Sequence, residues 1–187
     1  LALIAEHGME GLTYRNLSER FGISVPAFYR HFPSKADVLL GIMEYLGEVS
    51  LEIFLTAEKS GVNALDRLKL VLMGYAQQFS KNGALAAVLF PDVIGEGRRE
   101  LHDRVLEHMD ENRTRLAELL ADGMAAGLVR TDVPPERRAF VVMGSLKLEV
   151  TQCRLNDGGT DLVGRVASLW KNLEKILKAP EPSLEHS

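Results

Sequence analysis

Apolar residues recur at spacings of three and four along almost the whole chain, which is the repeat of amphipathic helices. No run of residues alternates between apolar and polar in the manner of a half-buried strand. Glycine, proline and asparagine interrupt the helical pattern at short intervals up to Lys35 and at wider intervals afterwards. The sequence therefore predicts an all-α protein of about nine helices, short at the amino end and mostly long in the remainder.

Composition agrees with a globular protein that has a substantial core. The chain has 187 residues, of which 46% are apolar and 26% charged. It has no stretch of about 18 consecutive apolar residues, so we expect no membrane span. A single cysteine, Cys153, rules out an internal disulfide and favours the reducing cytoplasm as the location.

We expect two units and a tail. Residues 1–47 contain the short helices, residues 48–179 form a larger helical body, and residues 180–187 are a tail that begins with the prolines that stop the last helix. The chain starts at Leu1 within a helical pattern that has no basic segment before it. We therefore expect the first turns of the first helix to be missing from the given residues.

Residues 13–35 have the pattern of a helix-turn-helix. Thr13 and Ser24 are suited to cap two short helices, because a side-chain oxygen there accepts hydrogen bonds from free backbone N–H groups. Gly22 ends the first helix where a left-handed residue is needed, and Pro26 falls in the first turn of the second. Two short helices around a glycine turn are typical of elements that enter the major groove of DNA.

The charge of this segment supports contact with nucleic acid. It contains four basic residues and one acidic residue, whereas the whole chain has a formal net charge of −4. A basic patch on an acidic body is what local binding of phosphates requires. Spacing and charge together leave two interpretations open: a DNA-binding element, or an ordinary helix hairpin with a solvated basic face.

Four motifs occur within the stretch from Ala2 to about Gly47: Gly11-Leu12-Thr13, Gly22-Ile23-Ser24, Phe28-Tyr29-Arg30-His31-Phe32 and Pro33-Ser34-Lys35. This set resembles the DNA-binding signature of the tetracycline-repressor (TetR/AcrR) family. The resemblance implies a homodimeric transcriptional regulator that binds double-stranded DNA. It further implies a repressor that a small-molecule effector releases from a palindromic operator.

The resemblance also implies contacts for individual residues. Val25, Pro26 and Ala27 are expected at the tip of the recognition helix, in apolar contact with thymine methyl groups. Arg15 is expected to reach a guanine edge. The other residues expected in the DNA interface are Thr13, Ser24, Tyr29, Arg30, His31 and Lys35. Among these, Tyr29 and Lys35 match phosphate-contacting positions, with simple packing between helices as the alternative for Tyr29 and a solvated side chain as the alternative for His31.

Two later helices have the pattern of a dimer interface. The helix expected at residues 135–155 has two apolar faces, of which the outer one contains Val141, Gly144, Leu148 and Leu155. The last helix has a seam with alternating spacings of four and three, formed by Leu162, Val166, Leu169, Leu173 and Ile176. We expect these two helices and those of a second copy to form a four-helix interface. The alternative is a helix buried in the centre of a monomer.

An effector site is expected inside the body. His108 and Asn112 lie one turn apart within an otherwise apolar stripe, and polar groups in such a stripe need partners. An apolar cavity around them is expected from Phe79, Phe90, Met109 and Met143. Hydrogen bonds to backbone or to buried water are the alternative for the polar pair, and ordinary packing in the core is the alternative for the apolar residues.

No pattern in the sequence indicates catalysis. The chain lacks a phosphate-binding glycine loop and a nucleophile elbow, and His102 and His108 fall on different helix faces. We therefore expect no enzyme activity, no metal site and no cofactor. A helical protein that binds small molecules and has no DNA function is the alternative to a regulator.

Overall fold

Helices account for nearly all of the computed structural model, which describes residues 1–89, 99–156 and 161–180. The amino-terminal helices are α1 (Ala2–His7), α2 (Tyr14–Phe21) and α3 (Val25–His31), with a short 3-10 helix at Met9–Gly11. The remaining helices are α4 (Lys35–Ser60), α5 (Ala64–Lys81), α6 (Gly83–Leu89), α7 (Arg99–Ala125), α8 (Pro135–Leu155) and α9 (Leu162–Leu177). The described residues contain no strand, which confirms the predicted all-α class and the nine helices.

Local chemistry sets the ends of the short helices as the sequence predicts. The Thr13 Oγ1 atom accepts from the Asn16 N–H at 3.1 Å, and the Ser24 Oγ atom accepts from the Ala27 N–H at 3.3 Å. Gly22 ends α2 with a φ of 66°, in the left-handed region that favours glycine. These caps fix the turn between α2 and α3.

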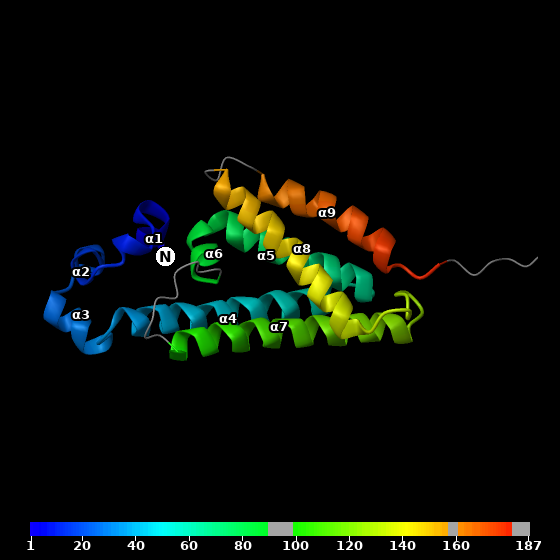
Figure 1. The fold of residues 1–187 in the computed structure, drawn as a ribbon, viewed down its shortest axis with the longest axis horizontal. Coiled ribbons are helices and arrows are strands. Elements are labelled where there is room, and N and C mark those ends of the chain that lie inside the picture. Colours follow the sequence, from blue (N-terminus) through cyan, green and yellow to red (C-terminus); the bar gives the residue numbers. More distant parts are fainter. Residues whose placement is uncertain (90–98, 157–160, 181–187) are drawn as a thin grey trace, which may run out of the picture.

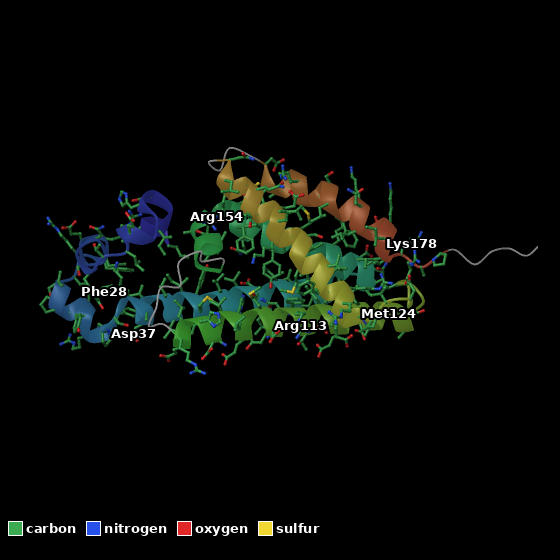
Figure 2. All side chains as sticks on the ribbon, in the orientation of Figure 1. Phe28, Asp37, Arg113, Met124, Arg154 and Lys178 are labelled. Atoms are coloured by element: carbon green, nitrogen blue, oxygen red, sulfur yellow. The ribbon has the colours of Figure 1, made fainter. Side chains whose placement is uncertain are left out.

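Helix α4 runs from the amino-terminal unit into the body and lies alongside α7 there (Figure 1). A capping box starts this helix: the Asp37 carboxylate accepts from the Ser34 N–H at 2.6 Å, and the Ser34 Oγ accepts from the Asp37 N–H. Asp37 is labelled at this end of α4 in Figure 2. Because α4 is continuous across residue 47, both units share one rigid element.

The core of the body lies between α4, α5, α7, α8 and α9. Val71, Val142 and Val166 have no exposed surface, and each comes from a different helix. The Arg130 N–H donates to the Leu177 carbonyl at 2.9 Å, which ties the loop after α7 to the end of α9. No helix among the described residues is long and apolar enough to cross a membrane.

Candidate DNA-binding and ligand-binding sites

Helix α3 is anchored on one side and open on the other. Phe28 is buried, and its ring lies 6.0 Å from that of Tyr14, 5.9 Å from that of Phe21 and 5.2 Å from that of Phe32, centre to centre. At the start of the helix Val25 and Pro26 are exposed and Ala27 is half-buried. Helix α3 thus has exposed apolar residues at its start and a buried aromatic anchor, Phe28, on its inner side.

Tyr29 both packs and remains accessible. Its ring lies 5.3 Å from that of Tyr14, whose hydroxyl donates to the Phe32 carbonyl at 2.9 Å. The Tyr29 residue is nevertheless 54% exposed. Packing between helices therefore does not exclude the predicted phosphate contact of Tyr29, because packing against Tyr14 holds the ring without burying it.

The basic residues of this unit differ in their surroundings. Arg15 pairs with Glu19 at 3.0 Å, with both side chains largely exposed, and Arg20 pairs with Glu6. Arg30, His31 and Lys35 have no ion pair among the described residues. An exposed pair such as Arg15–Glu19 contributes little stability, so Arg15 is able to leave Glu19 for another anionic partner.

The outer face of α8 exposes large apolar side chains. Val141 is 56% exposed, Leu148 57% and Leu155 78%, and a Cβ added to Gly144 would meet no atom within 4 Å. Two further apolar residues are also exposed: Phe140 on α8, which was not predicted from the sequence, and Ile176 on α9, which belongs to the predicted seam of that helix. Surface of this kind is typical of an interaction site.

The predicted contribution of α9 to a dimer interface needs correction. Leu162, Val166 and Leu173 are buried within the core of one protomer, so they are not available to a second copy. Leu169 is half-buried against the core. The reason is that the seam of α9 packs on α5 and α8, and a spacing of four and three does not reveal which partner it serves.

A cavity of about 340 Å³ lies between α5, α7 and α8. Its walls include five of the six residues expected at an effector site: Phe79, His108, Met109, Asn112 and Met143. The sixth, Phe90, lies outside the described residues. Most of the remaining wall is apolar, as in the pockets that bind small molecules.

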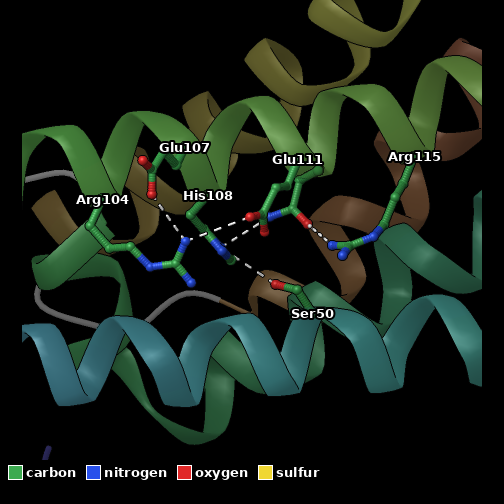
Figure 3. A network of polar contacts seen from close by, with 7 residues as sticks. Ser50, Arg104, Glu107, His108, Glu111 and Arg115 are labelled. Carbon is green, nitrogen blue, oxygen red and sulfur yellow. Dashed lines mark hydrogen bonds and ion pairs between the residues drawn. The ribbon is translucent and has the colours of Figure 1, made fainter.

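His108 belongs to a polar network that links α7 to Ser50 of α4 (Figure 3), and Asn112 is part of the same network. The His108 Nε2 atom lies 3.0 Å from the Asn112 Nδ2 atom and 3.5 Å from the Ser50 Oγ atom of α4. Burial lowers the pKa of His108, and the charges of Arg104 and Arg115 act in the same direction, whereas Glu111 opposes them. The imidazole is therefore neutral near pH 7.

Tyr75 is a cavity residue that the sequence analysis missed. It lies on α5 between Val71 and Phe79, four residues from each, and all three line the cavity. The spacing of four residues places Tyr75 on the same helix face as Val71 and Phe79, and this pattern could have indicated its position from the sequence. Burial raises the pKa of Tyr75 to about 12, although the nearby Ser50 hydroxyl and the Arg115 charge act in the opposite direction.

Charged residues lie toward the exposed side of the cavity. Arg113 pairs with Asp110 at 3.0 Å, and 36% and 72% of their side chains are exposed. Lys147 is exposed as well. No group of three or more metal-binding side chains occurs among residues that the structure describes.

The amino-terminal part of the chain matches a known family of regulators. The model of the family described as "Bacterial regulatory proteins, tetR family" matches residues 1–42. Over 120 residues the chain is 26% identical to the nucleoid occlusion factor SlmA of Vibrio vulnificus (strain YJ016), which covers 64% of this chain and 61% of that relative. The chain therefore spans about three fifths of the length of the curated relatives it matches.

Solved structures share the arrangement of both units. The transcriptional regulator FadR from Bacillus subtilis, in complex with stearoyl-CoA, has a TM-score of 0.81 and 21% identity over 94% of both chains. A TetR transcriptional regulator from Chloroflexus aurantiacus J-10-FL has a TM-score of 0.76 and 20% identity, covering 96% of this chain and 92% of that one. At these identities the similarity concerns the fold.

Proposed function

We propose that this chain, a member of the tetR family of bacterial regulatory proteins, is a homodimeric repressor that a small-molecule effector releases from a palindromic operator. The observation that carries the proposal is the path of α4, which starts beside the helix-turn-helix and continues along the cavity-bearing body. A single helix thus runs from a surface suited to DNA to Ser50, whose hydroxyl lies 3.5 Å from the cavity residue His108.

The DNA-binding step is assigned to α3 and the residues around it. The exposed Val25 and Pro26 present apolar surface to thymine methyl groups, and Arg15 presents a guanidinium that suits the O6 and N7 atoms of guanine. Tyr29 and Lys35 donate to phosphates, which fixes the position of the protein without reading sequence. Thr13 and Ser24 cap α2 and α3 and therefore set the angle at which these donors meet the duplex.

Dimerisation is assigned to the exposed apolar face of α8. Val141, Leu148 and Leu155 form this face together with Gly144, whose missing side chain permits close approach of a second helix. Burying such a patch against its copy would stabilise a two-fold dimer. A two-fold dimer presents two recognition helices, which is why the operator is expected to be palindromic.

Release is assigned to the contact between α7 and α4. The effector touches His108, and His108 in turn lies 3.5 Å from Ser50 on α4. A ligand that prefers one position of α7 would therefore displace α4 and change the separation of the two recognition helices. A ligand shifts this equilibrium only to the extent that it binds one conformation better than the other.

Selection of bound sequences from a random duplex library tests the proposal. We expect an inverted repeat to be enriched and to bind much more tightly than random duplex at moderate salt. Binding to every duplex alike, or to none at low salt, would contradict the proposal. The second of these outcomes would favour a helical small-molecule-binding protein without DNA function.

A further inference from the structure

Two polar atoms in the wall of the cavity lack a partner. The His108 Nδ1 atom and the Tyr75 hydroxyl are buried, and neither has a hydrogen bond of normal length and angle among the described residues, although the Ser50 hydroxyl lies near that of Tyr75. Both side chains line the same cavity, one from α7 and the other from α5. Because buried polar atoms in folded proteins are nearly always hydrogen-bonded, two such atoms around one cavity indicate a missing partner.

The hydrogen-bond network shows that the His108 Nδ1 atom is a donor. Arg115 donates to the Asn112 Oδ1 atom at 3.4 Å, which leaves the Asn112 Nδ2 atom facing the His108 Nε2 atom at 3.0 Å. An amide nitrogen only donates, so Nε2 accepts, and the neutral ring carries its proton on Nδ1. The Tyr75 hydroxyl is a second donor.

Both donors are uncharged at neutral pH, and most of the cavity wall beside them is apolar. Burial lowers the pKa of His108 and raises that of Tyr75. The charged residues Asp110, Arg113 and Lys147 are more exposed than His108, which is 2% exposed. The buried part of the cavity thus offers two neutral donors. Arg104 and Arg115, whose charges act on these donors, do not line the cavity, so neither pairs directly with a charged group bound there.

We infer that the cavity binds a ligand with an apolar body and an uncharged carbonyl oxygen, which accepts from His108 and Tyr75. This inference rests on the proposed function, since it names the chemistry of the effector for the same cavity. A carbonyl oxygen has two lone pairs and no proton, so it accepts both hydrogen bonds and leaves no donor unpaired. A carboxylate or an ammonium group at this place would have to lose its hydration.

Calorimetric titration of the whole chain with matched probes tests the inference. The probes are methyl alkyl ketones with chains from hexyl to decyl, together with fatty acids and primary amines of equal length. We expect one of the ketones to bind at least about tenfold more tightly than its matched acid and amine. Equal affinities, tighter binding of an acid or amine, or the absence of ketone binding would overturn the inference.

A pair of tyrosine variants locates the contact. Tyr75→Phe removes the hydroxyl but keeps the ring, which lies 6.1 Å from that of Phe79, and should weaken ketone binding about three- to tenfold. Tyr45→Phe is the matched control, because Tyr45 lies on α4, is 41% exposed and does not line the cavity. Unchanged ketone affinity in Tyr75→Phe would overturn the assigned hydrogen bond from Tyr75. If this variant fails to fold, the ratio of ketone affinity to acid affinity in the unmodified chain decides whether the inference stands.

The same preparation separates this inference from the proposed function. Binding to a random duplex at low salt is measured without any ketone present. DNA binding without ketone binding would overturn the inference and leave the regulator standing. Ketone binding without DNA binding would support the inference about the cavity and would contradict the proposed regulator.

Discussion

Arg15 and Lys35 are both cations of the amino-terminal unit, but their positions suit different contacts with DNA. Arg15 projects from α2, and 84% of its side chain is exposed beside Glu19. Lys35 is half-buried at the first position of α4, next to the capping residue Ser34. The exposed guanidinium is able to enter a groove, whereas the lysine stays close to the backbone of its own helix.

Substituting each cation should therefore change DNA binding in a different way. Lys35→Ala and Tyr29→Phe should weaken binding to all sequences about equally, because phosphates carry no base identity. Arg15→Ala should relax the preference at one position of each half-site, at a cost of about 1–3 kcal/mol. Fluorescence anisotropy on a panel of single-base operator variants measures both effects. A uniform loss of affinity across the panel for Arg15→Ala would remove its assigned role.

His108 should make the stability of the protein depend on pH. Burial lowers its pKa in the folded state, so below its ordinary value of 6.5 the unfolded chain binds a proton that the folded chain does not. The contribution of His108 to the free energy of unfolding is therefore fully present above pH 6.5 and is lost as the pH falls below that value. Urea unfolding from about pH 8 to about pH 5 should show a steeper loss for the natural chain than for His108→Gln. Parallel curves would show that this histidine is not the group responsible.

At the scale of elements, α8 has two faces with different tasks. Val142, Leu146 and Val150 face the core, whereas Val141 and Leu148 are exposed on the other side. The helix thus has two apolar faces on opposite sides, of which only one is covered within the protomer. The uncovered side is the surface to which the dimer is assigned.

Leu148→Glu should separate the dimer and leave the protomer folded. Because Leu148 is 57% exposed, the new carboxylate is solvated in the monomer, but in the interface it would be a buried unpaired charge that costs about 3–5 kcal/mol. Analytical ultracentrifugation should show a monomer. Circular dichroism should show that its helix content is unchanged. Val62→Glu, at an 88% exposed residue on the loop after α4, is the control and should remain dimeric. A fully dimeric Leu148→Glu protein would place the interface elsewhere.

The sequence allowed accurate prediction wherever structure depends on near neighbours. The caps at Thr13 and Ser24 depend on atoms three residues away, and Gly22 depends on its own backbone. The seam of α9 was misassigned because Val166 would show the same spacing against a partner as against its own core. Tyr75 was missed because its position beside the cavity depends on how α5 meets α7 and α8.

For the whole molecule, the main question is how a cavity in the body affects DNA binding. The network of His108, Ser50 and Asn112 joins α7 to the helix that begins beside the helix-turn-helix. Two recognition helices have to lie about 34–36 Å apart to enter successive major grooves on one face of the duplex. A displacement of a few ångströms in each protomer is enough to disturb that register.

Linkage requires the effect of ligand and operator on each other to be mutual. If the best-binding ketone weakens operator binding by some factor, the operator must weaken ketone binding by the same factor. Calorimetric titration of the ketone into the protein, with and without saturating operator, measures this factor from the ligand side. Equal ketone affinity in both titrations would mean that occupation of the cavity does not release DNA.

The most direct measurement of the central claim is the dependence of operator affinity on half-site spacing. Inserting about five base pairs between the half-sites turns the second one to the opposite face of the duplex, since a turn takes about 10–10.5 base pairs. A dimer with two fixed recognition helices predicts that affinity falls to about that of random duplex. An affinity unchanged by the insertion would show that each helix-turn-helix binds alone, and would contradict the account.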